Sequence, residues 1–156
     1  MPQSLSKMAV HLIFSTKDRT RALAYPELRI RLEGYLVGIL KNLDCPSIAT
    51  KSLIDHVHIL FVLSRTKTVA EVVQMGKQES SAWIKDQCPD RKDPYLIKFH
   101  WQNGYAVFSV SESKISTVKK YIDNQDEHHK RVTFHEEYRE FLNQHRVAFD
   151  EKYVWD

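Results

Sequence analysis

Two histidines separated by one residue interrupt an apolar stretch of the chain and could hold a metal ion. His56 and His58 flank Val57, and the residues that follow them are hydrophobic. Side chains two residues apart on a β-strand point to the same face, so both imidazoles would face one side of a sheet and Val57 the other. Neutral imidazole binds several divalent metals. The pair therefore predicts a metal site on a central strand.

A tyrosine and a glutamine near the end of a predicted helix add to this chemistry. Tyr121 and Gln125 are four residues apart, so they share one face of the helix. The amide oxygen of Gln125 shifts the expected metal site from a closed tetrahedral geometry towards an open octahedral one, which suits Mg²⁺ or Mn²⁺. Open positions would accept the oxygens of a phosphate group, and Tyr121 could attack its phosphorus atom as a nucleophile. Together these residues predict a DNA-nicking site.

Each of these residues also has a purely structural interpretation. A single buried histidine is usually satisfied by a backbone partner. A tyrosine that borders the apolar stripe of a helix usually keeps its hydroxyl in water. Two histidines on one face of a core strand interrupt the hydrophobic pattern, and such interruptions tend to be functional. His128 and His129, beyond the expected end of the helix, could touch the site or be exposed, and we favour exposure.

The elements that would position these residues alternate between strand and helix. Strands are expected at 8–15, 47–50 and 54–63, and at 98–101 and 105–109 either as a hairpin or as one strand bent at Asn103-Gly104. Helices are expected at 26–42, after the capping box Thr68 to Glu71, from Ser111 or Ser113 past Tyr121, and from Thr133 to Gln144. This order predicts an α+β fold, a ferredoxin-like antiparallel sheet with helices packed on one face.

Length and composition favour one compact domain that spans residues 1–156, with 133–156 as a C-terminal helix and tail. The chain has 156 residues, of which 42% are hydrophobic and only four are glycine, enough for a substantial core. No apolar run is long enough for a membrane span, and the N-terminus lacks a signal peptide, so we expect a cytoplasmic protein without membrane contact. Cys45 and Cys88 form no metal-binding pattern.

The charge is unevenly distributed and favours a polyanionic substrate. Residues 1–122 carry 18 Lys and Arg against 11 Asp and Glu, whereas residues 123–156 carry five against nine. The basic part holds the predicted site, which fits nucleic acid as a partner. The expected phosphate contacts are Lys17, Arg19, Arg65, Lys67, Lys119 and Lys120. Trp101 is a candidate for stacking on an unpaired base.

Five segments of the chain resemble the single-tyrosine HUH transposases, in which HUH denotes histidine, a hydrophobic residue and histidine. The segments are His11–Lys17, Asp55–Leu60, Trp101–Tyr105, Tyr121–Gln125 and Tyr153–Asp156. The segments occur in the family's order and spacing, and the resemblance extends over essentially the whole chain. It is closest to the REP-associated tyrosine transposases. Ala106 departs from the glycine expected after Gly104-Tyr105.

The resemblance implies an HUH endonuclease fold and a specific reaction. Members of the family cut single-stranded DNA near the foot of a hairpin with a tyrosine and a divalent metal, and some act as homodimers. Carried over, Tyr121 attacks phosphorus and leaves a 5′-phosphotyrosine link with a free 3′-OH. His56, His58 and Gln125 would hold the metal, either Mg²⁺ or Mn²⁺. The 3′-OH of another strand could then reverse the step, which makes the protein a transposase.

Other functions remain open at this point. A domesticated, catalytically silent protein could keep the fold and bind hairpin DNA, although its signature would be loss of Tyr121 or a metal ligand, and neither is lost. A replication-initiator-type nickase has similar chemistry but usually carries additional domains. A metal-dependent hydrolase that uses water would form no covalent link to DNA.

Overall fold

A four-stranded antiparallel sheet forms the centre of the molecule. The computed structural model describes residues 2–86 and 92–156. The strands are β1 (Met8–Ser15), β2 (Ser47–Ser52), β3 (His56–Leu63) and β4 (Ala106–Val110), in the spatial order β2-β3-β1-β4. The central strands β1 and β3 pair so that Ser15 faces His56 and Met8 faces Leu63. The predicted α+β class and the three N-terminal strands are therefore confirmed.

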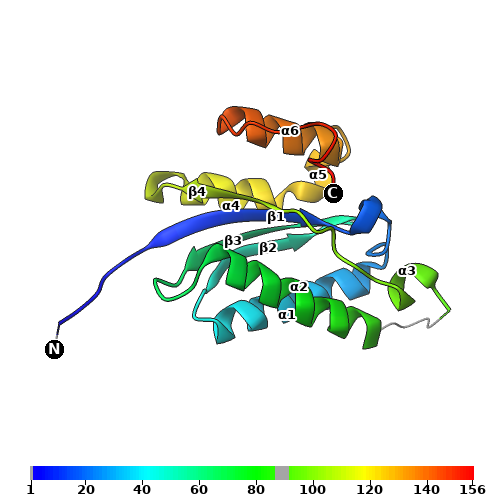
Figure 1. Ribbon diagram of the computed structural model, residues 1–156, viewed down its shortest axis with the longest axis horizontal. Coiled ribbons are helices and arrows are strands. Elements are labelled where there is room, and N and C mark those ends of the chain that lie inside the picture. Colours follow the sequence, from blue (N-terminus) through cyan, green and yellow to red (C-terminus); the bar gives the residue numbers. More distant parts are fainter. Residues whose placement is uncertain (1, 87–91) are drawn as a thin grey trace.

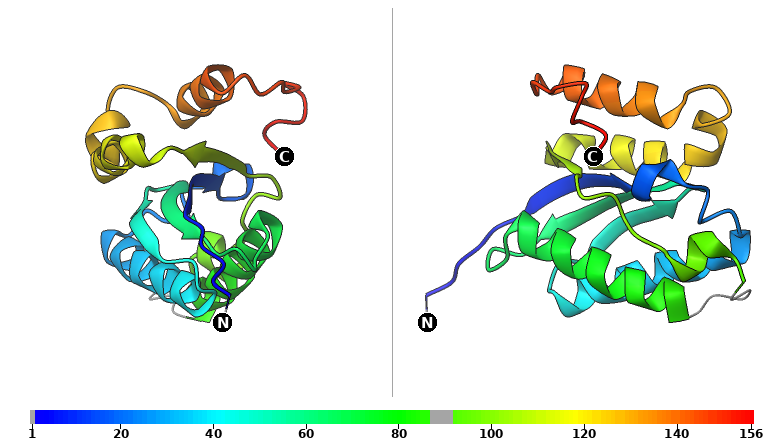
Figure 2. Two further views of the ribbon diagram at one scale, coloured as in Figure 1. Left: turned by 90° about the vertical axis from the view of Figure 1, so that its left-hand side faces the viewer. Right: turned by 45° about the vertical axis from the view of Figure 1, so that its right-hand side comes forward.

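Two long helices cover one face of the sheet. Helix α1 (Pro26–Asn42) and helix α2 (Val69–Asp86) lie side by side below the strands in Figures 1 and 2. They bury the odd-numbered positions of β3, such as Val57 and Phe61, in the larger hydrophobic core. The predicted bounds of the first helix match the structure. The capping box before α2 also forms, since Thr68 and Glu71 hydrogen-bond each other's backbone amides.

The opposite face carries a second helical layer, which corrects the expectation of helices on one face only. Helices α4 (Ile115–Asp123), α5 (Gln125–His128) and α6 (Phe134–Gln144) lie above the sheet in Figure 1. Helix α4 packs near β2 and β3 through Ile122, and α6 covers β1 and β4. The physical reason is that β1 and β3 are hydrophobic on both faces, so each face needs a cover.

The segment before β4 is one interrupted strand and not a hairpin. Trp101 bridges Thr16 just beyond β1, and Ala106 pairs with Ile13 within it, so both parts follow the same neighbour. Short helical segments complete the described chain: η1 (Lys17–Arg19), α3 (Pro94–Ile97) and η2 (Glu112–Lys114). The first of these extends from the end of β1 near His56, which places it at the same end of the sheet as the histidine pair.

Two findings bear on the predictions from composition. Cys45 is a buried free thiol, whereas Cys88 lies outside the described residues. Within residues 2–86 and 92–156, no helix combines the length and hydrophobicity needed to cross a membrane.

Candidate metal and tyrosine site

Strand β3 turns both predicted histidines towards the layer formed by α4 to α6. His56 and His58 are almost completely buried, and Val57 between them points into the core on the other face. The two rings lie in a T-shaped arrangement with centroids 5.2 Å apart. The shared face predicted from the spacing is therefore present, and it looks into the seam between α4 and α6.

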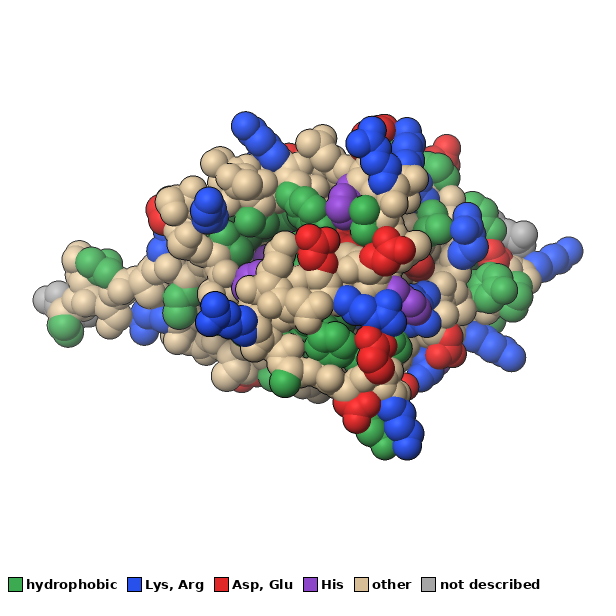
Figure 3. All heavy atoms as spheres, turned by 90° about the horizontal axis from the view of Figure 1, so that it is seen from above, with side chains coloured by type: hydrophobic (Ala, Val, Ile, Leu, Met, Phe, Trp, Pro, Cys, Tyr) green, Lys and Arg blue, Asp and Glu red, His purple; other side chains and the backbone are tan. Residues whose placement is uncertain are grey.

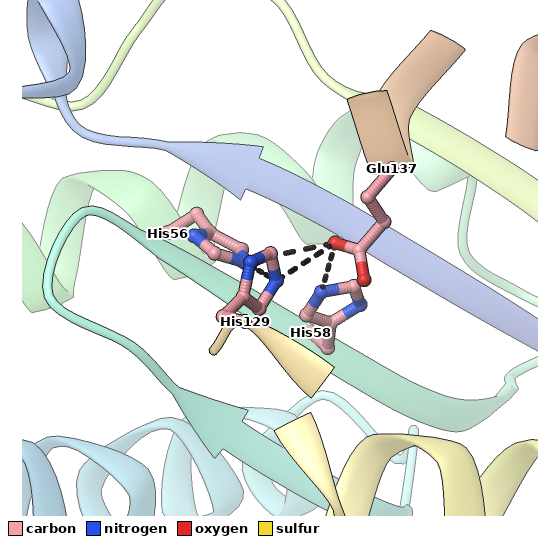
Figure 4. Close-up of side chains that lie close together, drawn as sticks. All are labelled: His56, His58, His129 and Glu137. Atoms are coloured by element: carbon pink, nitrogen blue, oxygen red, sulfur yellow. Dashed lines mark hydrogen bonds and ion pairs between the residues drawn. The ribbon is translucent and has the colours of Figure 1, made fainter. Parts of the chain in front are cut away.

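Two residues from the C-terminal helices join the histidine pair. Glu137 descends from α6 and His129 follows the end of α5, as Figure 4 shows. Glu137 Oε1 lies 2.9 Å from His58 Nε2 and 3.2 Å from His129 Nε2, while the Nε2 atoms of His56 and His129 are 3.1 Å apart. One ligand atom from each of the four residues lies within 4.8 Å of the others, so this buried group could bind a metal ion.

Outer hydrogen bonds turn the Nε2 atoms of the three histidines inwards. His56 Nδ1 lies 2.7 Å from a carboxylate oxygen of Asp55, and His129 Nδ1 lies 2.9 Å from the carbonyl of Val132. Both partners only accept hydrogen bonds at neutral pH, so each Nδ1 carries the proton. Such outer partners fix the ring orientation and tautomer of metal-binding histidines. The third ring, His58, has its Nδ1 2.9 Å from His11 Nε2.

The cluster combines imidazole rings with one buried carboxylate, and each alters the pKa of its neighbours. Burial lowers the pKa of His56 to about 4, so its ring is neutral at pH 7. Burial would raise the pKa of Glu137, but hydrogen bonds from His129 and His58 outweigh it and hold that pKa well below its usual range. Burial likewise lowers the pKa of His129, but the hydrogen bond and charge of Glu137 raise it overall. A fixed negative charge therefore sits among the imidazoles.

Tyr121 reaches the same carboxylate from α4. Its hydroxyl donates a hydrogen bond to the second oxygen of Glu137 and lies 3.2 Å from His128 Nε2. Burial, followed by the negative charge of Glu137, raises the pKa of Tyr121 above its ordinary value. The phenol is therefore protonated at neutral pH, and Glu137 links it to the histidine cluster.

Gln125 is fully buried, but it does not share a helix with Tyr121 as predicted, because α4 ends at Asp123 and Gln125 begins α5 after the break at Asn124. Its amide nitrogen donates to the backbone carbonyl of Tyr121 over 3.3 Å, and its side chain favours the phenolate form of that residue. Among the described residues, the amide oxygen of Gln125 has no hydrogen-bond partner. A buried acceptor without a partner is costly, and a bound cation would satisfy it.

Sequence reasoning missed His129 and Glu137. The prediction that His129 is exposed is wrong, since it packs against His56 with ring centroids 4.6 Å apart. Glu137 did carry a signal, because it lies three residues after Phe134 and four before Phe141 and so interrupts the apolar face of α6. No local signal places His129, because its position depends on how the turn between α5 and α6 folds back.

The predicted DNA contacts separate into two groups along the sheet. Lys17 and Arg19 lie in η1 at the same end of the sheet as His56, and the guanidinium of Arg19 sits over the ring of Trp155. Arg65 and Lys67 follow the opposite end of β3. Of these two pairs, only Lys17 and Arg19 therefore lie at the end of the sheet that carries His56. Figure 3 shows basic and acidic side chains intermixed over the α4 to α6 side.

The remaining predicted contacts differ in exposure. Lys119 and Lys120 are exposed on α4, and Lys119 pairs with Asp123 over 2.8 Å. Trp101 is buried, and its indole nitrogen donates to Ser80 over 2.9 Å. Phe14 and Phe99 pack edge-on against its ring. This placement gives Trp101 a role in the core and argues against base stacking.

A cavity of about 340 Å³ opens beside the cluster. Its lining includes His56 and His129, with Asp55 and Lys130 among the polar residues and Phe134 among the apolar ones. The cavity gives a ligand a route to the edge of the histidine cluster. Its volume falls at the lower end of the range for small-molecule sites.

Acidification should destabilise the metal-free protein. Burial lowers the pKa of His11 to about 3 and that of His56 to about 4, from an ordinary value of 6.5. The unfolded chain takes up protons below pH 6.5 while the folded protein does not, so the free energy of unfolding falls as the pH drops towards 4. The raised pKa of His129 acts in the opposite direction. We expect a net loss of about 2–4 kcal/mol between pH 6.5 and pH 5.

Urea denaturation of the metal-free protein across this pH range would measure that loss. His11→Gln should show a shallower dependence, since one of the two depressed histidines is gone. A free energy of unfolding that stays constant over the interval would contradict the assigned pKa shifts.

Comparison with known proteins adds evidence from outside the chain. A model of the family described as IS200-like transposases matches residues 4–125, which include His56, His58, Tyr121 and Gln125. The ISDra2 transposase TnpA of Deinococcus radiodurans is 25% identical over 119 residues, which make up 76% of this chain and 84% of that protein. His129 and Glu137 lie beyond the matched region.

Two solved structures share the fold. A candidate transposase from Deinococcus radiodurans R1 superposes with a TM-score of 0.63 at 26% identity, over 80% of this chain and 95% of that one. A REP-associated tyrosine transposase, solved with a bound REP hairpin, superposes with a TM-score of 0.59 at 13% identity, over 85% of this chain and 74% of that one. The second likeness is one of fold alone.

Proposed function

Because the chain belongs to the IS200-like transposase family, we propose that it cuts and rejoins single-stranded DNA near hairpins in a metal-dependent reaction with a 5′-phosphotyrosine intermediate. The observation that carries this proposal is the position of Glu137. One of its oxygens accepts from the Tyr121 hydroxyl, and the other contacts His58 and His129. A nucleophile and a set of metal ligands thus share one buried carboxylate.

The donor set supports a metal at this place. His56 and His129 each direct the proton on Nδ1 outwards, and their Nε2 atoms meet at 3.1 Å beside the Glu137 carboxylate. Such a contact requires a shared proton or a cation between the two nitrogens. His56 and His58 remain the proposed core of the site, and the unpartnered oxygen of Gln125 supports its role as a further ligand.

His129 and Glu137 add an imidazole and a carboxylate to the proposed ligands. A set rich in imidazole favours Mn²⁺ over Mg²⁺, because nitrogen ligands suit transition metals and Mg²⁺ prefers oxygen. When bound, a divalent ion would neutralise charge on the nonbridging oxygens of the scissile phosphate. The protein's own contribution is a set of rings already oriented towards one point.

Tyr121 is the proposed nucleophile. Its phenolic oxygen forms a bond to phosphorus while the bond from phosphorus to the 3′ oxygen breaks, which leaves a 5′-phosphotyrosine and a 3′-OH. The phenol must lose its proton for this step, and Glu137 accepts the hydrogen bond that this proton makes. The leaving 3′ oxygen gains a proton. Attack by another 3′-OH reverses the step, so strand transfer requires no external energy source.

The proposed DNA path enters from the end of the sheet that carries η1. The last residue of β1 pairs with His56, and Lys17 and Arg19 follow shortly after it in the sequence. No other predicted phosphate contact is as near to this end of β1 along the chain. The cavity beside His56 and His129 could admit the nucleotide next to the scissile phosphate. Lys119 and Lys120 lie beside Tyr121 in sequence and are proposed to hold the backbone near the nucleophile.

Incubation with end-labelled hairpin DNA tests this function. We expect a covalent protein–DNA adduct on a denaturing gel in the presence of Mg²⁺ or Mn²⁺, and none after treatment with a chelator. Binding without an adduct, across a broad panel of hairpins and both ions, would favour a silent DNA-binding protein. Cleavage without an adduct would instead indicate a hydrolase that uses water.

A further inference from the structure

A buried histidine outside the predicted site touches one of its proposed metal ligands. His11 lies on β1, is 1% exposed, and faces the α4 to α6 layer beside His58. Its Nε2 atom is 2.9 Å from His58 Nδ1, and their ring centroids are 5.1 Å apart. Phe141 packs edge-on against the His11 ring at 5.1 Å between centroids. A polar ring is thus held in a nonpolar layer with His58 as its partner.

The other two histidines of the cluster show what this position supplies. Asp55 holds His56 through Nδ1, and the Val132 carbonyl holds His129 in the same way. In each case the outer partner leaves Nε2 to face Glu137. His11 occupies the corresponding place behind His58, so every ring of the cluster has one partner on its outer nitrogen. Losing such a partner usually weakens metal binding.

We propose that His11 is a positioning residue that holds His58 with Nε2 turned into the metal site, in both the metal-free and the metal-loaded protein. The inference rests on the metal site of the proposed function, but it does not depend on the tyrosine chemistry. His11 is not one of the four residues whose ligand atoms lie within 4.8 Å of one another, so it would act through the ring of His58.

Histidine suits this position because it can reverse its hydrogen bond. In the metal-free protein, His58 Nε2 donates to Glu137 over 2.9 Å, so its Nδ1 accepts from His11. A metal ligand needs the Nε2 lone pair, so His58 must then carry its proton on Nδ1 and donate to His11. In this change His58 loses the proton on Nε2, and the proton between the two rings moves from His11 Nε2 to His58 Nδ1. His11 takes up a proton on Nδ1 in its place. The total number of protons on the two rings is unchanged.

Mn²⁺ binding measured by calorimetry tests the inference on the intact protein without DNA. His11→Phe keeps the ring volume but loses the hydrogen bond, and we expect Mn²⁺ to bind about 10- to 100-fold more weakly. His11→Gln has an amide that both donates and accepts, so we expect its affinity within about threefold of the wild type. Phe141→Leu is the matched packing control, because it alters a nonpolar contact of His11, and it should bind Mn²⁺ like the wild type.

Three affinity results would overturn the inference: wild-type affinity in His11→Phe, equal losses in His11→Phe and His11→Gln, or an equal loss in Phe141→Leu. The last two would assign His11 to packing. A wild-type protein that binds no Mn²⁺ would also overturn it, since no ligand would need positioning. If the protein forms no DNA adduct but the expected affinities hold, the proposed function fails and this inference stands.

Nitrogen NMR of the wild-type protein provides a test that needs no substitution. With diamagnetic Zn²⁺ bound, we expect the proton of His58 on Nδ1, with coupling across the hydrogen bond to His11. A proton on His58 Nε2 in the loaded protein would overturn the inference even if His11→Phe failed to fold.

Discussion

Replacement of Tyr121 by phenylalanine is expected to abolish covalent attachment to DNA while hairpin binding persists. The substitution removes the only atom that would bond to phosphorus and leaves the ring in the seam between α4 and α6. Loss of a covalent nucleophile typically lowers the rate by at least about 10⁴-fold. Rates of adduct formation on a denaturing gel, together with hairpin affinity in a mobility-shift assay, would separate the two effects.

Tyr138→Phe is the matched control for this experiment. Tyr138 is a second tyrosine of the α4 to α6 layer, and its ring packs against Phe134 and Trp155. We expect it to cleave at about the wild-type rate. Substantial cleavage by Tyr121→Phe would show that Tyr121 is not the nucleophile. Loss of both cleavage and hairpin binding would instead show that the substitution damages the fold.

Replacement of His58 by alanine is the second large expected effect. Both of its ring nitrogens are engaged, one with Glu137 and one with His11, so the change removes a proposed ligand and leaves two partners unsatisfied. We expect Mn²⁺ affinity to fall by about 100-fold or more and metal-dependent cleavage to be lost with it. Calorimetry with Mn²⁺ and the adduct assay would measure the two losses separately. Exposed His100 supplies the control, and His100→Ala should bind Mn²⁺ normally.

A pair of conservative variants distinguishes the ligands beyond the histidine pair. Glu137→Gln removes the charge while it keeps the shape, and Gln125→Leu removes the unpartnered amide oxygen. If both residues contribute, each variant should weaken Mn²⁺ binding by about 10-fold or more. Unchanged affinity in one variant would exclude the replaced residue from the ligand set. Unchanged affinity in both would mean that only the imidazoles bind the metal.

The sequence was most informative where the physics is local. The helix Pro26–Asn42 and the strand Met8–Ser15 were predicted with the observed bounds, since proline and the hydrophobic period mark them directly. The shared face of His56 and His58 follows from strand geometry alone. The family resemblance added the association with Tyr121, which spacing could not provide, and the model match over residues 4–125 confirms that family.

The missed features depend on long-range packing. Glu137 meets His58 across 79 positions of the chain, and His129 meets His56 across 73. Such contacts require the path of the turn between α5 and α6, which no local pattern encodes. The second helical layer did carry a signal, since strands that are hydrophobic on both faces need a cover on each face.

The carboxylate of Glu137 has a consequence for the order in which ligands bind. Its pKa lies well below the usual range, so it is an anion at neutral pH. On the proposed function, a DNA phosphate must approach the hydroxyl of Tyr121, which is the group that Glu137 already contacts. The Glu137 carboxylate and the DNA phosphate are both anions, and they repel each other when they lie this close in a buried site. A cation bound first converts that repulsion into attraction, so the binding sequence should be metal and then DNA.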